Sequence, residues 1–469
     1  MTRKPNIVYL FADQWRRQAV GYANEDPVIT PNMDQFAKES VVFTQAVSCS
    51  PLCSPHRASM LTGKYPMGTG VYTNCKVGAD VMLQPNEICI SDVLKQAGYR
   101  TGYIGKWHLD LPEKNISDNP TSGAEGWDAF TPPGPKRHGF DYWYSYGAWD
   151  DHLAPHYWED TPEKIQIKQW SVKHETDKAI EYIREQNETD PFALFVSWNP
   201  PHSPFDDVPE KYKQVYENNI KDDFRKNVNK NSFMVHTGEE VEGGPDQLAE
   251  KRKNYFAAIT GIDENFGRIL QVLQEENLEE NTIVVLTADH GEMMGSHGLM
   301  AKHVWYEESI GVPFCIRWPG EIKPDKTDAL LNTVDIMPTL LQLADLDIPA
   351  TVEGNDLSPV LESYTDGPDK TFLCAYPGRK EAIENFEQHG LNNLAYGWRA
   401  VRSVDNLYVI HRGYAPGEET VRLLYDLKKD PDQLNPQKII NSDENELIRE
   451  LEQSLFTWLS KQGDPFMQE

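Results

Sequence analysis

The chain has 469 residues, of which 39% are hydrophobic, 11% aromatic and 25% charged, a composition typical of a folded protein rather than a disordered one. Its 73 Asp and Glu residues outnumber its 45 Lys and Arg residues, and the net charge of −28 argues against sequence-independent nucleic-acid binding, which needs a cationic surface. No apolar run approaches the roughly 20 residues of a membrane span, and the 6 cysteines are too few for a disulfide scaffold.

Four continuous apolar runs are typical of strands buried on both faces of a parallel sheet: residues 6–12, 101–104, 192–198 and 282–286. Helical patterns alternate with these runs. They comprise a stretch capped by Ser91 and closed by Gly98, an amphipathic segment around Ile180, and residues 255–274. The alternation predicts an α/β sheet. Each apolar run is followed by polar residues, and ligands of open α/β sheets bind at that edge.

The pattern changes beyond about residue 365. Short strands are expected at residues 371–375, 398–403, 407–411 and 423–427, followed by an amphipathic helix at 444–459. We therefore predict two domains, a large one over residues 1–365 and a smaller α+β subdomain over residues 366–469. The chain as written shows no signal peptide, which predicts a cytoplasmic protein, or a periplasmic or secreted one if a native signal was trimmed.

The segment CSPHRASMLTG at residues 53–63 is the most informative in the chain. Pro55 suits the first turn of a helix, which places Cys53 at a helix N-terminus, where exposed N–H groups favour a bound anion. Arg57 lies four residues further on and can reach the same face. Taken alone, the pattern fits a buried cysteine beside a surface arginine equally well.

Two signatures resemble those of the type I sulfatases of the alkaline phosphatase superfamily. The first is Cys-x-Pro-x-Arg followed by Thr-Gly, at residues 53–63, and the second is Gly-Tyr-x-Thr-x-x-x-Gly-Lys-Trp-His, at residues 98–108. PNIVYLFADQ near the start, TADHG at 287–291 and LYDLKKDP at 424–431 extend the resemblance over nearly the whole chain. It implies an alkaline phosphatase-like fold, with a large mixed, mostly parallel sheet sandwiched by helices. It also implies a smaller C-terminal α+β subdomain that carries a short antiparallel sheet and a helix.

The resemblance implies that a separate maturation enzyme oxidises Cys53 to formylglycine. One hydroxyl of the hydrated aldehyde, a gem-diol, would attack sulfur, and deprotonation of the other would expel sulfate. Asp13, Gln14, Asp289 and His290 would hold a divalent metal, most readily Ca²⁺ because the ligands are mostly oxygens. Many sulfatases have Asp at the position of Gln14 and Asn at that of His290, and this difference leaves Mn²⁺ or Mg²⁺ as alternatives.

The remaining catalytic roles are also carried over from the family. Lys106 and Lys302 would neutralise the transferred sulfuryl group, and Arg57 would orient the diol. His108 would be the base for collapse of the hemiacetal, and His202 would be the general acid at the leaving oxygen. Taken singly, the site residues also fit structural roles, with Asp13 as a turn or N-cap residue, Lys302 as a surface charge and His202 as a loop histidine. Their joint appearance at the strand ends, in the order of the family, favours the functional roles.

The substrate is expected to be a sulfated carbohydrate, an oligosaccharide from polysaccharide degradation. Its contacts are sought in the loop-rich segment 115–168, whose aromatic, acidic and imidazole groups suit sugars, and in the C-terminal unit. The substrate-binding candidates are Trp149, Asp151, His152 and Arg399, among the neighbours Trp143, Tyr146, Asp150, His156, Trp398, Arg402 and His411. The aromatic residues could instead pack the segment onto the sheet.

Three alternative functions remain open. An aryl or choline-type sulfatase is the nearest. A phosphonate monoester or phosphodiester hydrolase of the same superfamily fits the Asp-Gln and Asp-His pairs, although such relatives generally lack the Gly-Lys-Trp-His signature. A non-catalytic anion-binding protein with an unmodified Cys53 belongs to a different class.

Overall fold

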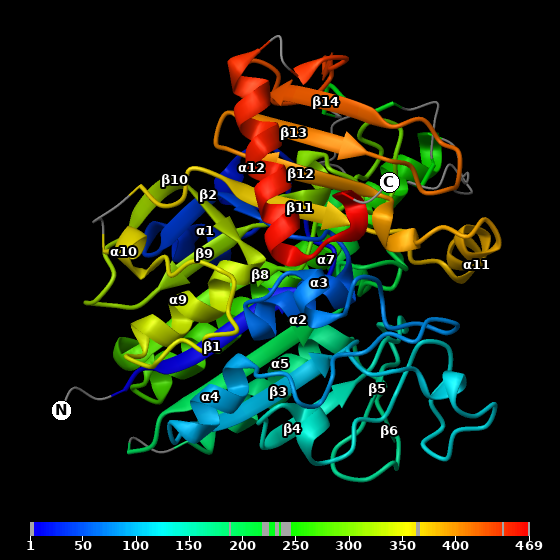
Figure 1. The fold of residues 1–469 in the computed structure, drawn as a ribbon. Helices are drawn as coiled ribbons and strands as arrows, with labels where there is room; N and C mark the ends of the chain where they lie inside the picture. Colours follow the sequence, from blue (N-terminus) through cyan, green and yellow to red (C-terminus); the bar gives the residue numbers. More distant parts are fainter. Residues whose placement is uncertain are drawn as a thin grey trace.

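The computed structural model of the protein describes residues 4–186, 189–217, 225–229, 234–235, 245–362, 366–442 and 445–467. Two sheets dominate it, a large one of eight strands and a smaller one of five strands (Figure 1). In spatial order the large sheet contains β10 (Asp325–Asn332), β2 (Val41–Val47), β9 (Phe314–Arg317), β8 (Thr282–Ala288), β1 (Asn6–Ala12), β7 (Phe192–Trp198), β3 (Arg100–Lys106) and β4 (Tyr142–Tyr146).

The large sheet is mixed and mostly parallel, as expected. Only β9 runs antiparallel to its two neighbours, β2 and β8. Every residue of β1, β7 and β8 is buried, which is why these strands are continuous apolar runs in the sequence. The predicted strands 6–12, 101–104, 192–198 and 282–286 are thus confirmed, each with the observed bounds given above.

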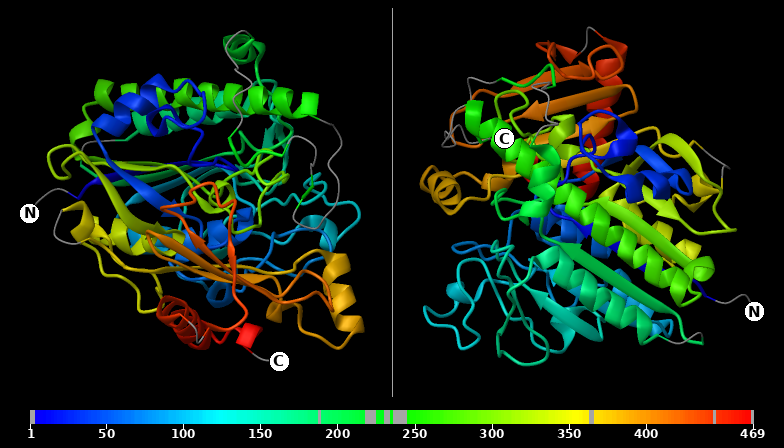
Figure 2. Two further views of the ribbon diagram at one scale, coloured as in Figure 1. Left: turned by 90° about the horizontal axis from the view of Figure 1, so that it is seen from above. Right: turned by 180° about the vertical axis from the view of Figure 1, so that it is seen from behind.

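Helices cover both faces of this sheet (Figures 1 and 2). α1 (Pro31–Lys38), α5 (Ser171–Arg184) and α7 (Pro245–Glu275) pack together on one face. On the other face lie α2 (Cys53–Thr62), α4 (Ile90–Gln96) and α9 (Ile336–Leu343). The short helices are α3 (Pro66–Thr69), α6 (Glu210–Lys213), α8 (Glu307–Ile310) and α10 (Ser358–Leu361). The helix predicted at 255–274 is the second part of α7.

The smaller sheet is antiparallel throughout and carries α12 (Glu446–Gln462) on one face (Figure 1). Its strands are β11 (Thr371–Ala375), β12 (Trp398–Arg402), β13 (Asn406–His411), β14 (Val421–Asp426) and β15 (Gln437–Lys438), with α11 (Lys380–Gln388) between the first two. This matches the predicted strands and terminal helix, although residue 444 lies outside the described residues. The predicted domain boundary at residue 365 also lies outside them, and the two-domain division stays a prediction.

Two expectations about local structure were wrong. Ser91 is not the cap of α4: the helix begins at Ile90 with Cys89 as N-cap, and the Ser91 hydroxyl donates to the His138 carbonyl at 2.5 Å. The segment 115–168 is not loop throughout, because it contributes the edge strand β4, along with the short pair β5 (His156–Tyr157) and β6 (Ile165–Gln166). The five residues of β4 are too short and too aromatic to show a period.

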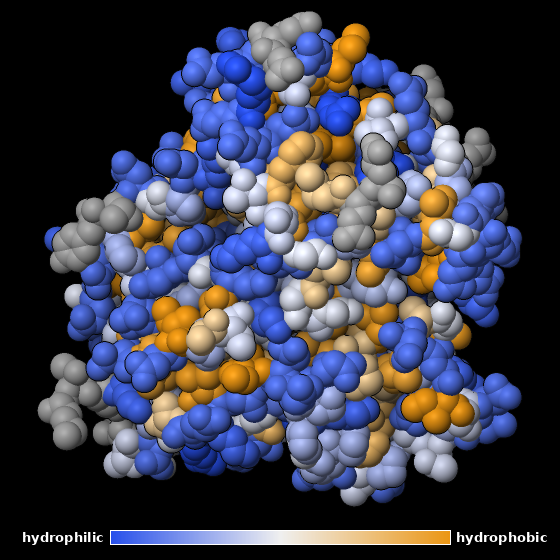
Figure 3. Space-filling view, viewed as in Figure 1, coloured by the Kyte–Doolittle hydropathy of each residue, from blue (hydrophilic) through white to orange (hydrophobic). Residues whose placement is uncertain are grey.

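The face of the molecule seen in Figure 1 is mainly hydrophilic, with hydrophobic residues scattered over it (Figure 3). Among the described helices, none combines the length and the apolar character needed to span a bilayer.

Candidate active site

The register of the central strands brings two acidic segments side by side. Ala12 at the end of β1 pairs with Ala288 at the end of β8, so both strands stop at the same level. The next residues, Asp13 and Asp289, therefore emerge together at the carboxyl edge of the sheet. Asp289 donates its backbone N–H to the Ala12 carbonyl at 3.1 Å, and its carboxylate accepts the Gln14 N–H at 2.9 Å.

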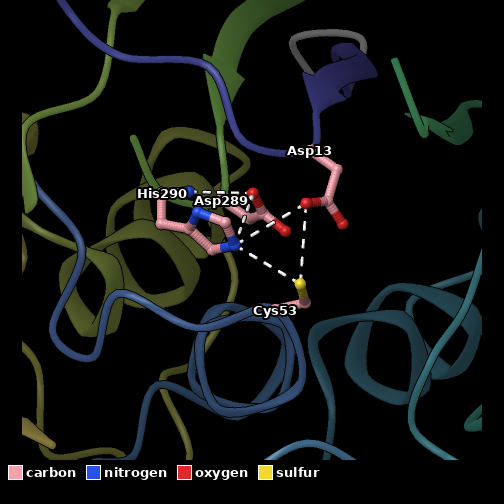
Figure 4. Close-up of side chains that lie close together, drawn as sticks. All are labelled: Asp13, Cys53, Asp289 and His290. Atoms are coloured by element: carbon pink, nitrogen blue, oxygen red, sulfur yellow. Dashed lines mark hydrogen bonds and ion pairs between the residues drawn. The ribbon is translucent and has the colours of Figure 1, made fainter. Parts of the chain in front are cut away.

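Cys53 is the first residue of α2, as Pro55 predicted, and its side chain points at this edge (Figure 4). Its thiol donates to Asp13 Oδ1 at 3.5 Å and lies 3.3 Å from His290 Nε2. Candidate ligand atoms of Asp13, Cys53, Asp289 and His290 all lie within 4.8 Å of one another, and all four residues are buried. Burial and the nearby Asp13 raise the pKa of the Cys53 thiol to about 12, so the unmodified thiol is protonated at neutral pH.

The chemistry of this donor set fits a hard divalent cation. Two buried carboxylates face the same point, and burial together with the charge of Asp13 raises the pKa of Asp289 to about 7. Although burial opposes it, Lys106 and the neighbouring cationic groups hold the pKa of Asp13 well below its usual range. A divalent cation would relieve the repulsion between the carboxylates. The Gln14 carboxamide accepts a hydrogen bond from the Lys302 ammonium and donates to Glu292 at 2.5 Å, so its role as a ligand stays a prediction.

The Arg57 guanidinium lies beneath the two carboxylates, stacked over the Phe11 ring. Its Nη2 donates to Asp13 Oδ2 at 3.1 Å and to Asp289 Oδ2 at 3.3 Å. Its Nη1 donates to the Lys106 carbonyl at 2.8 Å and to Ser197 Oγ at 2.7 Å. One planar fork thus connects the ends of four neighbouring strands. Arg57 therefore acts on the site through the groups it positions.

Lys106 reaches the site from the end of β3. Its ammonium forms an ion pair with Asp13 Oδ2 at 2.7 Å and donates to Asn199 Oδ1 at 3.0 Å. The preceding Gly105 has a φ of +97°, and a Cβ there would lie 2.2 Å from the Ser197 carbonyl oxygen. Only glycine therefore lets β3 pass β7 closely enough to deliver Lys106 at this position.

His108 and His202 are among the residues that line a pocket of about 330 Å³, together with Cys53, Lys106 and Lys302. His108 contacts the Cys75 carbonyl at 3.1 Å through Nε2, and its buried Nδ1 has no hydrogen-bond partner within the described part of the chain. Burial and Lys106 lower the pKa of His108 well below its usual range, so the imidazole is neutral. His202 lies with Nδ1 2.7 Å from the Ser203 carbonyl oxygen.

The structure thus brings together Asp13, Cys53, Arg57, Lys106, Asp289 and His290 in direct contact, with His108, His202 and Lys302 lining the same pocket. Sequence reasoning gave no role to two residues that hold His202 and Lys106 in place, Asp150 and Asn199. Asp150 lies 3.4 Å from His202 Nδ1 and accepts from Asn199 Nδ2 at 3.0 Å. Asp150 belonged to the polar cluster noted in the sequence, whereas Asn199, directly before Pro-Pro-His, gave no signal of its own.

The substrate-binding candidates fare differently. Arg399 was wrong as a wall of the pocket: it is 0% exposed, forms an ion pair with Asp464 at 2.8 Å and lies 3.8 Å over the Tyr376 ring. A buried guanidinium needs a buried counter-charge, and Asp464 supplies it. The pair therefore links the small sheet to the segment that follows α12. His152 is buried and bonds the His202 carbonyl oxygen at 2.8 Å, so it supports the loop of that histidine.

The other two candidates lie beside the pocket in local contacts. The Asp151 carboxylate accepts the Ala154 N–H at 2.8 Å. The Trp149 carbonyl oxygen accepts from Asn199 Nδ2 at 2.8 Å, and its half-buried ring lies 5.6 Å from that of His156. Neither residue is among those that line the pocket, and their contact with substrate stays a prediction. Trp398 and Arg402 of the C-terminal unit are buried as well, and Arg402 pairs with Glu307 at 2.9 Å.

Known proteins match the chain from end to end. The family model described as Sulfatase covers residues 5–346, and the model described as N-sulphoglucosamine sulphohydrolase, C-terminal, covers residues 295–461. The chain is 36% identical to an endo-4-O-sulfatase of Bacteroides thetaiotaomicron over 99% of this chain and 94% of that protein. It is 37% identical to an ulvan-active sulfatase of Formosa agariphila over 99% of this chain and 82% of that one. A solved structure from work on the metabolism of multiple glycosaminoglycans by B. thetaiotaomicron is similar with a TM-score of 0.86, at 35% identity over 99% and 98% of the two chains.

Proposed function

The chain belongs to the sulfatase family and is a sulfuric ester hydrolase, and from this premise we propose that it removes sulfate from a sulfated carbohydrate, an oligosaccharide derived from a polysaccharide. The observation that carries the proposal is the pocket in which Cys53 lies among Lys106, Lys302 and His202 and which opens past an exposed tryptophan, Trp127. Cations at the base suit a sulfate group, and an aromatic ring at the rim suits the apolar face of a sugar. The endo-4-O-sulfatase and ulvan-active sulfatase relatives support a carbohydrate over an aryl ester.

Sulfatases in general use a formylglycine residue and a metal, and we extend both to this chain. Cys53 would be converted to formylglycine by a separate maturation enzyme, since it stands at the start of α2 within the Cys-x-Pro-x-Arg signature. Asp13, Asp289 and His290, with Gln14 as a further candidate, would hold the cation, with Ca²⁺ expected first and Mn²⁺ or Mg²⁺ as alternatives. When bound, the cation polarises the S–O bond of the ester.

The protein's own side chains supply the remaining steps. Lys106 and Lys302 would bind the sulfate oxygens and offset their negative charge. His108 would take a proton at its unpartnered Nδ1, and its neutral state suits a base. His202 would give a proton to the leaving sugar oxygen, held in place by the Ser203 carbonyl and Asp150. Arg57 would keep Asp13 and Asp289 at their separation.

A substrate screen tests the proposal. Purified protein would be offered oligosaccharides with sulfate at defined positions, an aryl sulfate and a phosphodiester with a matched leaving group. We expect desulfation of at least one oligosaccharide with a higher kcat/KM than for the aryl ester. Turnover of the aryl ester alone, or a higher efficiency on the phosphodiester, would overturn the carbohydrate proposal.

The modification of Cys53 is tested separately by peptide mass spectrometry on protein made in the native host. The expected mass is that of the aldehyde in place of the thiol. A fully unconverted Cys53 in protein that shows no turnover would support the non-catalytic alternative.

A further inference from the structure

The rim of the active-site pocket carries two cationic side chains that the chemistry at Cys53 does not use. Lys76 and Arg379 both line the pocket. They come from segments about 300 positions apart in the chain, the first following α3 and the second immediately preceding α11. Sequence reasoning had no reason to pair them.

The loop of Lys76 is tied directly to the catalytic residues. The carboxamide oxygen of Asn74 accepts the Ser54 N–H at 3.1 Å, in the first turn of α2. Cys75 donates its N–H to Ser54 Oγ at 3.1 Å, while its carbonyl oxygen lies 3.1 Å from His108 Nε2. Lys76 therefore stands at a set distance from the nucleophile position and from His108, rather than on an independent surface loop.

The segment of Arg379 packs against the same loop. A Cβ on Gly378 would lie 2.0 Å from Thr73 Oγ1, so the two segments approach as closely as they do only because residue 378 is glycine. Burial and the charge of Arg379 lower the pKa of Lys76 to about 8, with Glu381 acting weakly in the opposite direction. Within the described chain, no carboxylate lies within ion-pair distance of the Lys76 ammonium. Two cationic side chains thus lie near each other on the partly buried lining of the pocket, and their combined positive charge favours an anionic group there.

An exposed aromatic ring lies between this rim and the base of the pocket. Trp127 is 44% exposed, its ring is stacked on His108 with centroids 6.2 Å apart, and the Lys76 ammonium lies 5.9 Å from its centroid. A large exposed indole next to a catalytic histidine offers a flat apolar face to a sugar ring.

We propose that Lys76 and Arg379 bind a second anionic group of the substrate, a carboxylate or a second sulfate, on the sugar next to the one whose sulfate ester reaches Cys53, with Trp127 under the intervening ring. The inference rests on the proposed carbohydrate substrate and narrows it to a polyanionic glycan. It also gives the chain a local attraction for such a polymer, against the repulsion expected from a net charge of −28.

The test uses three disaccharides that carry the same target sulfate ester. One has a hexuronic acid as the neighbouring sugar, the second has its carboxyl-reduced, neutral counterpart, and the third has that counterpart with a second sulfate. We expect kcat/KM to be about 10- to 100-fold higher for an anionic neighbour than for the neutral one, as one to two charge-assisted hydrogen bonds imply. Preference for the first disaccharide identifies a carboxylate, and preference for the third identifies a sulfate.

Two variants assign the preference to the rim. Lys76→Met and Arg379→Gln should each bring the ratio of anionic to neutral kcat/KM towards one, whereas Lys380→Met should keep the wild-type ratio. Lys380 is the matched control because it is an exposed cation next to Arg379, paired with Glu384 at 3.8 Å, and it does not line the pocket. Circular dichroism and the Tm confirm that each variant is folded.

The outcomes separate this inference from the proposed function. Equal efficiency on all three disaccharides in the wild type, or a preference that survives both rim substitutions, overturns the anion site while leaving the carbohydrate sulfatase intact. Turnover of an aryl sulfate with no desulfation of any carbohydrate overturns both.

Discussion

Replacement of Arg57 by lysine tests whether the site needs a positive charge beneath its carboxylates or the fork of a guanidinium. Arg57→Lys keeps the charge and changes the geometry. Arg57 donates four hydrogen bonds, at 2.7 to 3.3 Å, to Asp13, Asp289, Ser197 and the Lys106 carbonyl. An ammonium has three donors that radiate from one atom, so it cannot reach partners spread over four strand ends.

The magnitude follows from the two bonds to carboxylates. A hydrogen bond to a charged group contributes about 1.5–3 kcal/mol, so loss of both costs about 3–6 kcal/mol. If that free energy is expressed in the transition state, kcat falls about 100-fold or more, since each 1.36 kcal/mol corresponds to about tenfold. A role in charge alone predicts almost no change.

The assay measures kcat on the best substrate of the screen, divided by the fraction of residue 53 that mass spectrometry finds converted. That correction is needed because Arg57 belongs to the signature on which maturation is expected to act. Arg402→Lys is the control, because Arg402 is also buried and donates to Glu307 at 2.9 and 3.1 Å but lies outside the pocket. It should lower the Tm and leave corrected kcat at the wild-type value. A folded, converted Arg57→Lys protein with wild-type kcat would refute the positioning role.

Four further measurements address the same structure. Cys53→Ala should abolish turnover without lowering the Tm appreciably, because a buried side chain changes little in size; residual activity would remove Cys53 as the nucleophile position. Dialysis against a chelator should abolish activity, and adding Ca²⁺, Mn²⁺ or Mg²⁺ should restore it, most fully for the ion that best fits Asp13, Asp289 and His290. Full activity after exhaustive metal removal would contradict the metal site. Arg399→Met should lower the free energy of unfolding by about 3–5 kcal/mol, because it leaves Asp464 buried without a counter-charge, while kcat stays at the wild-type value; a stable variant with reduced kcat would return Arg399 to the substrate site. Although burial opposes it, Arg402 and Arg17 hold the pKa of Glu307 at about 2, against an ordinary value of 4.5. The resulting stability is therefore present above about pH 4.5 and is lost as the pH falls towards 2, so Glu307→Gln should flatten the Tm profile over that range, and an unchanged profile would refute the pairing.

Local pattern was enough to identify the elements that carry the chemistry. The buried strands at residues 6–12 and 282–286 are apolar throughout because both of their faces are covered, and that requirement is visible in a few consecutive residues. Pro55 likewise indicates the start of α2 and therefore that Cys53 lies at the N-terminus of this helix. β4 was missed because five aromatic-rich residues at a sheet edge carry no such signal.

The amino-acid sequence by itself thus determined the class of fold, the family and the residues at the strand ends. Tertiary structure decided how they meet. The register that levels Ala12 with Ala288 places Asp13 beside Asp289, and no local pattern encodes a pairing between residues more than 270 positions apart. Burial is also decided by the tertiary structure. An arginine is expected at the surface from its charge, but Arg399 is buried because the folded chain places Asp464 beside it as an ion-pair partner. Lys76 and Arg379 become neighbours because the segment of Gly378 packs closely onto Thr73. Such a contact between distant segments exists only in the folded chain.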